Sequence, residues 1–149
     1  GFHEQKLYDQ DFICLVSATH PRIGPEGVTS RQYLQEGHIG ILTSASYSAL
    51  YRSLASQHLK RRVALELPGF MGLATIVEST ELVATIPRHI GETLAEGRAI
   101  RVVRCPVRIA GFTVKQFWHE RYHHEPGHRW LRSLCSELFR PGRSPRGSR

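Results

Sequence analysis

The sequence predicts an α/β domain whose sheet is largely parallel. Short apolar runs, typical of buried strands, alternate along the chain with segments whose apolar residues recur at helical spacing. Strands that alternate with helices favour parallel pairing with helical crossovers on the faces of the sheet. Of the 149 residues, 40% are hydrophobic and 22% are charged, which is the composition of a domain that buries a core.

Apolar runs between polar or turn-forming residues predict the strands. The first run, FICLV, is continuous and follows Asp11, and the run from Val63 to Leu67 alternates and is closed by Pro68. Strands are predicted over residues 12–16, 38–42, 63–67, 82–86, 100–103 and 112–118, and a further short strand over residues 107–109.

The helices between these strands have recognisable ends. Thr29 or Ser30 can cap a helix that Gly37 ends. Pro87 suits a first helical position, because the N–H that it lacks would have no partner there. Helices are predicted over about residues 30–36, 47–59, 70–78, 87–95 and 126–139.

The net charge of +7 does not predict a nucleic-acid-binding module. Four of the 20 basic residues lie in the tail 140–149 (RPGRSPRGSR), which has no acidic residue and is expected to be a disordered, solvated end. The basic run Lys60, Arg61 and Arg62 is interpreted as the solvated start of the strand that follows.

The cysteines and the N-terminus indicate a cytoplasmic protein. Cys14, Cys105 and Cys135 are odd in number and form no CxxC motif, so they are interpreted as small buried side chains in a reducing compartment. Residues 1–10 lack a signal-peptide pattern, and no apolar run is long enough for a membrane span.

A histidine-rich segment is the strongest local candidate for chemistry. The segment contains His119, His123, His124 and His128. Imidazoles at this spacing could hold zinc or nickel. They fall on a strand end, a turn and a first helical turn, however, so no single element aligns them. We interpret the segment as a structural turn, with a metal-dependent enzyme as a minor alternative. No nucleophile elbow or carboxylate pair predicts catalysis, and no cofactor is expected.

The segment Thr43–Ser48 (TSASYS) has two interpretations that remain open. Its hydroxyl and N–H groups stand where a strand meets a helix N-terminus, which favours binding of an anion or a carboxylate. Ser46 or Ser48 can equally serve as a helix cap.

Several stretches together resemble the effector domain of the LysR family of bacterial transcription regulators, and most closely its aromatic-catabolism and nodulation subgroup. The last stretch is the most specific, with a strand ending in FWH, a turn to Pro126 and a helix containing WLR. The similarity covers residues 1–139, in the stretches Leu7–Pro21, Arg62–Pro68, Ser79–Arg88 and Phe112–Phe139.

The resemblance implies a periplasmic-binding-protein-like (type 2) fold, with two α/β lobes joined by crossing strands. Residues 1–87 would hold the second lobe, complete, with the crossing strands 12–16 and 82–86. Residues 88–139 would be the C-terminal half of the first lobe, and residues 140–149 the tail. The other half of that lobe and a winged helix-turn-helix would lie upstream of Gly1.

The resemblance also implies a site and partners. The ligand would be a small effector with an aromatic ring and a polar or carboxylate end. Its contacts would come from Gln10, Ser44, Tyr47, Gly69, Phe70, His89, Phe112 and Thr113. A homo-oligomer, either a dimer or a tetramer, is expected, with DNA bound only through the helix-turn-helix that this chain lacks and with no membrane partner. The alternative is a fragment of a periplasmic solute-binding protein.

Overall fold

The computed structural model describes residues 1–42 and 45–140. The chain divides into two compact units, each described by itself below. Asp11–Gly111 forms one unit, and Gly1–Gln10 forms the other together with the residues from Phe112 onward.

A five-stranded sheet with the order β4-β3-β5-β2-β6 forms the centre of the Asp11–Gly111 unit. β3 pairs in parallel with β4 and β5, whereas β2 pairs antiparallel with both β5 and β6. β6 therefore runs in the same direction as β3, β4 and β5, and β2 opposes them. The predicted, largely parallel sheet is confirmed apart from β2. The strands are β2 (Phe12–Ser17), β3 (Gly37–Ile41), β4 (Arg62–Leu67), β5 (Val83–Pro87) and β6 (Ile100–Arg104).

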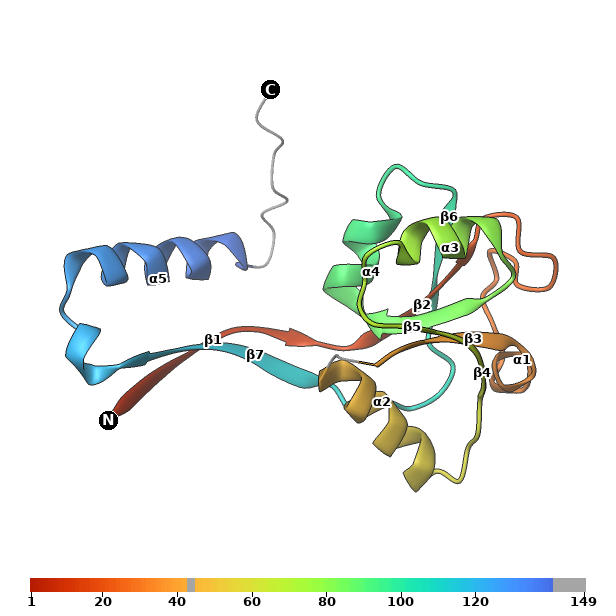
Figure 1. The fold of residues 1–149 in the computed structure, drawn as a ribbon, viewed down its shortest axis with the longest axis horizontal. Coiled ribbons are helices and arrows are strands. Elements are labelled where there is room, and N and C mark those ends of the chain that lie inside the picture. The colour runs from red at the N-terminus through yellow and green to blue at the C-terminus, as the bar shows by residue number, and fades with distance from the viewer. Residues whose placement is uncertain (43–44, 141–149) are drawn as a thin grey trace. The chain divides into compact units, whose positions relative to one another are not determined.

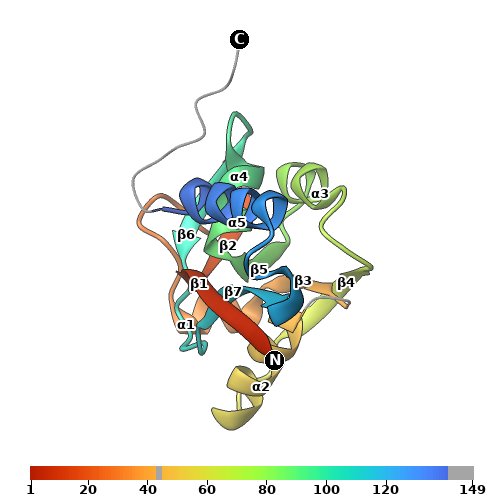
Figure 2. The same ribbon diagram turned by 90° about the vertical axis from the view of Figure 1, so that its left-hand side faces the viewer.

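Helices cover both faces of this sheet. Figures 1 and 2 show α3 and α4 on one face and α2 on the other. α2, α3 and α4 connect β3 to β4, β4 to β5 and β5 to β6, so they are the crossovers that parallel strands require. The helices are α1 (Ser30–Gln35), α2 (Ala45–Ser56), α3 (Leu73–Ser79) and α4 (Arg88–Ala95).

The ends of α1 show which of the predicted capping residues acts. Thr29 is the N-cap, since its Oγ1 accepts a hydrogen bond from the Gln32 N–H, and the Gln32 side chain accepts one from the Thr29 N–H in return. Gly37 does not end the helix in a left-handed conformation as predicted. It is the first residue of β3, and Glu36 before it is already extended.

One face of the sheet packs closely on α4 at Gly91. A Cβ atom built there would lie 2.5 Å from Cδ1 of Ile13 and 3.3 Å from Cγ1 of Ile86, so the helix can approach the sheet only without a side chain at this position.

We expect Gly91→Val to lower the free energy of unfolding by about 1–3 kcal/mol, because the added methyl groups must displace packed core atoms. Urea unfolding followed by circular dichroism measures the change. Thr93→Val on the exposed side of the same helix is the control, expected to stay within about 0.5 kcal/mol of the parent. Equal stability of the two variants would contradict the close packing.

The predicted short strand over residues 107–109 is wrong. The segment from Cys105 to Gly111 forms no strand, and Pro106 within it has no N–H to donate to a neighbouring strand.

The second unit is a two-stranded antiparallel ribbon with one long helix. β1 (Phe2–Gln10) pairs with β7 (Phe112–His119) from Phe2 opposite His119 to Gln10 opposite Phe112. A 3-10 turn over Glu120–Tyr122 leads to α5 (Pro126–Leu138), which begins at the predicted residue. α5 packs on the ribbon through Arg132, whose carbonyl accepts from the Gln116 side chain at 3.1 Å and whose guanidinium lies 4.4 Å from the Trp118 ring.

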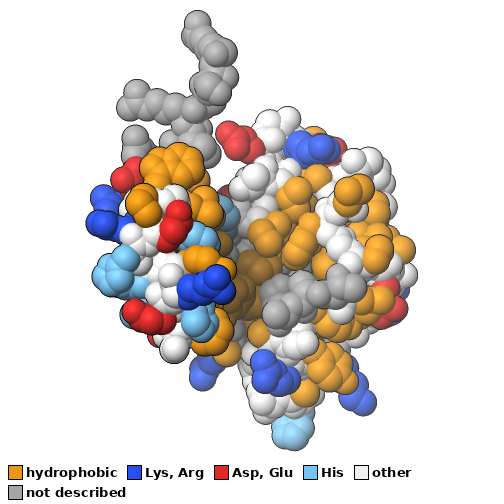
Figure 3. Space-filling model, turned by 60° about the vertical axis from the view of Figure 1, so that its left-hand side comes forward, with side chains coloured by type: hydrophobic (Ala, Val, Ile, Leu, Met, Phe, Trp, Pro, Cys, Tyr) orange, Lys and Arg blue, Asp and Glu red, His pale blue; other side chains and the backbone are white. Residues whose placement is uncertain are grey.

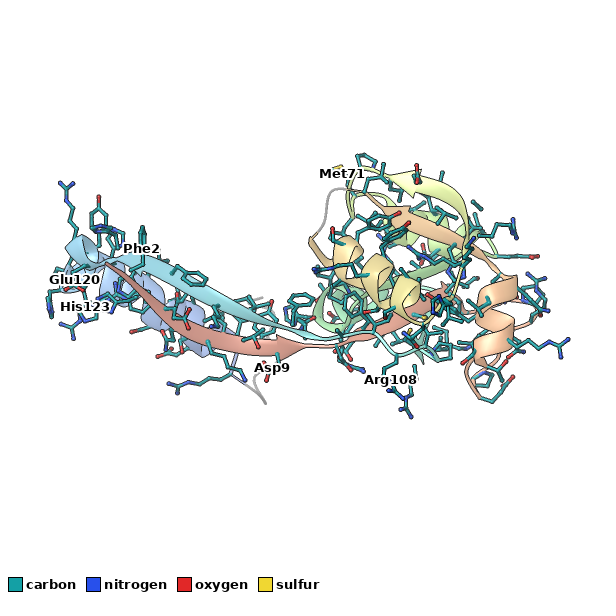
Figure 4. All side chains as sticks on the ribbon, turned by 90° about the horizontal axis from the view of Figure 1, so that it is seen from below. Phe2, Asp9, Met71, Arg108, Glu120 and His123 are labelled. Carbon is teal, nitrogen blue, oxygen red and sulfur yellow. The ribbon has the colours of Figure 1, made fainter. Side chains whose placement is uncertain are left out.

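The histidine-rich turn is held by contacts within this unit, at the end of the ribbon labelled by Glu120 and His123 in Figure 4. His3 hydrogen-bonds the Glu120 carboxylate and stacks on the His123 ring with centroids 4.0 Å apart. The Trp118 Nε1–H donates to Nδ1 of His123 at 3.1 Å, and the His119 side chain accepts from the Arg121 N–H. These contacts agree with the interpretation of the segment as a structural turn.

Large apolar side chains lie exposed on this unit, and Figure 3 shows hydrophobic side chains on its visible face. The exposed residues lie on β1, β7 and α5 and include Phe2, Phe117, Trp130, Leu131 and Leu138. Large apolar side chains that are exposed on several elements are typical of surface that another segment or subunit covers.

The division into units differs from the expected boundary at residue 87. β6 pairs with β2, so residues 88–111 lie in the same unit as the strands before them. The expected crossing strands 12–16 and 82–86 are neighbours in one sheet, and the chain passes between units after Gln10 and after Gly111. The assignment of units to lobes stays a prediction.

In the described ranges, no helix is long and apolar enough to span a bilayer.

Candidate ligand-binding site

The carboxyl ends of β3, β4 and β5 lie at one edge of the sheet, because these strands are parallel. In α/β proteins the segments that follow such ends form ligand sites. Four of the predicted residues follow these strands, namely Tyr47, Gly69, Phe70 and His89. Ser44 and the side chain of Ser46 lie outside the described residues, so the two interpretations of their segment stay open.

Tyr47 and Phe70 come together at this edge. Both line a small cavity of about 10 Å³, which has room for about one water molecule. Phe70 also packs against the hydrophobic core, so it has a structural role as well. The other residues that line the cavity are Ile39, Ile41, Leu50, Arg61, Thr85 and Ile86.

Arg61 is a polar residue of this cavity, and the sequence analysis did not assign it to a site. Its guanidinium lies 5.8 Å from the Tyr47 ring centroid, as a cation–π contact. Its Nη1 is fully shielded from solvent and has no hydrogen-bond partner among the described residues. A shielded guanidinium N–H of this kind is a strong donor for an anion such as a carboxylate.

The interpretation of the basic run as a solvated strand start is therefore wrong for Arg61. Lys60 and Arg62 are exposed as expected, but Arg61 is half-buried. The alternation of side chains along the strand could have indicated this burial. Arg61 lies two residues before Val63 and four before Leu65, so it points to the same, inward face as they do.

His89 is exposed in the first turn of α4, beside an ion pair that ties this helix to β2. Arg88 donates from Nε and Nη2 to the two carboxylate oxygens of Asp11, at 2.7 Å each. These bonds hold the pKa of the Asp11 carboxyl below its usual value. The pair lies on a groove of about 460 Å³, which the residues at and after the end of β6 also line.

The remaining predicted residues lie together in the other unit. Gln10 is nearly buried and lies directly opposite Phe112 in the β1–β7 ribbon. Thr113 donates from Oγ1 to Oδ1 of Asp9, labelled in Figure 4, at 2.7 Å. The structure thus brings Gln10, Phe112 and Thr113 to one end of the ribbon, and Tyr47 and Phe70 to one edge of the sheet.

Comparison with known proteins shows what this chain is similar to. The family model "LysR substrate binding domain" matches residues 1–140. The transcriptional activator NagR of a Ralstonia species is 26% identical over 140 residues, which is 93% of this chain and 46% of that protein. The transcriptional regulator LinR of Sphingobium indicum is 33% identical over 143 residues, with 93% of this chain and 46% of that protein covered.

A nodulation regulator and a solved structure extend this similarity. Nodulation protein D 1 of Sinorhizobium fredii is 25% identical over 131 residues, which is 87% of this chain and 40% of that protein. The regulatory domain of MexT, a transcriptional activator of Pseudomonas aeruginosa, superposes with a TM-score of 0.76 at 23% identity, covering 93% of this chain and 68% of that one. The chain spans about half the length of the curated relatives that it matches.

Proposed function

Since the chain belongs to the family of LysR substrate binding domains, with its periplasmic-binding-protein-like fold, we propose that it senses a small effector for a bacterial transcription regulator. The observation that carries this proposal is the family match over residues 1–140. The predicted resemblance to the LysR family is confirmed. A periplasmic solute-binding protein is not favoured, because the relatives are named as regulators of transcription.

We propose that the whole regulator, like its relatives, is longer than the matched stretch. The additional part would contain the residues that contact DNA and the rest of the first lobe. The apolar surface of Phe117, Trp130 and Leu131 would then be covered by that part or by a second subunit. We also propose that the regulator is a homo-oligomer, lies in the cytoplasm and has no enzymatic activity.

The proposed effector carries an anionic group and an aromatic ring. The shielded Nη1 of Arg61 supports the anionic group, since an oxygen atom is about the size of the cavity beside it. The rings of Tyr47 and Phe70 line the same cavity, and since it has room for about one oxygen atom, a ligand ring would lie outside it, against these two rings. A ligand would shift the equilibrium between lobe orientations only by its difference in affinity for them, typically about 1–3 kcal/mol.

We expect Arg61→Gln to weaken binding of an aromatic carboxylate by about tenfold to a hundredfold, because a charge-assisted hydrogen bond contributes about 1.5–3 kcal/mol. Titration calorimetry of the chain with benzoate and salicylate measures the affinity, and phenol and benzyl alcohol serve as uncharged analogues.

The matched control is Arg62→Gln, which removes the same charge from the exposed neighbour and should leave the affinity unchanged. Melting curves of both variants separate lost binding from lost folding. Equal affinities of the two variants would remove Arg61 from the site. No preference for the carboxylates over the uncharged analogues would contradict the proposed ligand class.

A further inference from the structure

Cys14 and Cys105 are distant in sequence but adjacent in the sheet. β2 and β6 pair so that Cys14 lies directly opposite Val103. Cys105 is the first residue after β6, two positions beyond Val103, and its side chain interacts with that of Cys14. Cys14 and Cys105 are therefore diagonal neighbours at the end of the β2–β6 pair.

The two thiols interact and have unequal environments. Cys14 is fully buried, and this burial raises the pKa of its thiol, whose sulfur lies 3.5 Å from the Thr85 hydroxyl oxygen. Cys105 is half-buried, and the neighbouring Cys14 thiol and Val107 N–H lower the pKa of its thiol. The positive charge of Arg61 acts in the same direction on Cys105. The pair thus combines one sheltered thiol with one thiol that favours the thiolate.

Solvent reaches Cys105 through the groove of about 460 Å³. The charged residues that line this groove are mainly basic, namely Arg88, Arg104 and Arg108 beside Asp11. Arg108, labelled in Figure 4, lies on the same segment as Cys105. A partly exposed cysteine in positive surroundings, with a second thiol in contact, is the arrangement found at reactive cysteines.

We propose that Cys105 and Cys14 form an oxidation site, in which a hydroperoxide that enters the groove converts the two thiols into a disulfide. The Cys105 thiolate attacks one peroxide oxygen, the O–O bond breaks, and Cys105 becomes a sulfenic acid while hydroxide leaves and takes up a proton. Cys14 then attacks the Cys105 sulfur and loses its proton, and the S–O bond breaks to release water. Two thiols are oxidised by two electrons, and hydrogen peroxide is reduced to two water molecules.

The disulfide would change the shape of the groove. Diagonal neighbours stand further apart than directly opposite residues, so closing the bond draws the backbone at Cys105 toward β2. The segment that begins at Cys105 forms no strand, so it is free of the ladder bonds that would resist this movement. The proposal shares the charge of Arg61 with the anion site, but it does not require a ligand to be bound there.

The test is a short treatment of the chain with hydrogen peroxide, followed by alkylation of free thiols, trypsin digestion and mass spectrometry. The expected product joins the peptide Leu7–Arg22, which contains Cys14, to the peptide Cys105–Arg108. Cys135 on α5 is the internal control, and it should stay reduced while Cys105 reacts several times faster. In concentrated urea, links among all the cysteines should appear without preference.

Variants test the order of the steps. In Cys14→Ala the disulfide cannot close, so a dimedone adduct should accumulate on Cys105 to a higher yield than in the parent chain. Cys105→Ser should abolish both products, and Cys135→Ser should change neither. A linked peptide that contains Cys135, no link between Cys14 and Cys105 in the folded parent chain, or oxidation of Cys105 no faster than Cys135 would each overturn the proposal. The result for the parent chain holds even where a variant fails to fold.

Discussion

Replacing Leu15 with alanine is expected to lower the free energy of unfolding by about 2–5 kcal/mol. Leu15 is 0% exposed and lies in β2, the strand between β5 and β6. It belongs to the core cluster in which the sheet packs against α3. The loss combines the transfer free energy of the removed carbon atoms with the cost of the cavity that remains.

Urea unfolding of the chain followed by circular dichroism measures this effect. Leu42→Ala is the matched control, since the same atoms are removed from a side chain that is 51% exposed, and a change within about 0.5 kcal/mol is expected. Should both variants unfold at the same urea concentration as the parent, β2 would not be the centre of the core.

Stability is expected to fall between pH 6.5 and about pH 4 because of His38. This residue is 0% exposed in β3, and its Nε2–H donates to the Tyr33 carbonyl at 2.7 Å. Burial lowers the pKa of His38 from 6.5 to about 4, since the charged form loses its hydration. Nδ1 has no partner within the described ranges, so protonation there would leave a buried charge unpaired.

The sign follows from proton binding. As the pH falls below 6.5, the unfolded chain binds a proton at His38 and the folded chain does not, so unfolding becomes more favourable. This loss of stability is complete near pH 4, where the folded form also binds the proton. Over the whole interval it amounts to about 3 kcal/mol of the free energy of unfolding.

His38→Gln tests this assignment, because the glutamine amide can still donate to the Tyr33 carbonyl but does not titrate. Between pH 7 and pH 4.5 the parent chain should lose about 2 kcal/mol more stability than the variant. Carboxylates with lowered pKa values, such as Glu36, titrate in both chains and cancel in the difference. His124→Gln, at an exposed position, should behave like the parent. Parallel pH profiles of the parent and His38→Gln chains would show that His38 does not titrate as described.

Local patterns predicted most of the elements because they report which side of a segment is buried. The run FICLV, the alternation from Val63 to Leu67 and Pro126 at a helix start each gave an element that the structure confirms. The strand β1 was not predicted, because its sequence FHEQKLYDQ is mostly polar and its partner β7 lies more than a hundred residues away.

The candidate site was predictable only in part, for a similar reason. The positions of Tyr47 and Phe70 follow from the ends of predicted parallel strands, which meet at one edge of a sheet. Neither the shielded Nη1 of Arg61 nor the contact of Cys14 with Cys105 follows from local sequence. Each depends on which strand lies beside which.

The sequence by itself therefore determined the α/β class, the crossover helices and the resemblance to a family, because periodicity and turn chemistry are local properties. The tertiary structure alone decided that β2 runs against the other strands of its sheet and that β1 pairs with β7. It also decided that Arg61 lies half-buried and that two cysteines meet. These features depend on contacts between distant segments, whose free energy is gained only when the whole sheet assembles.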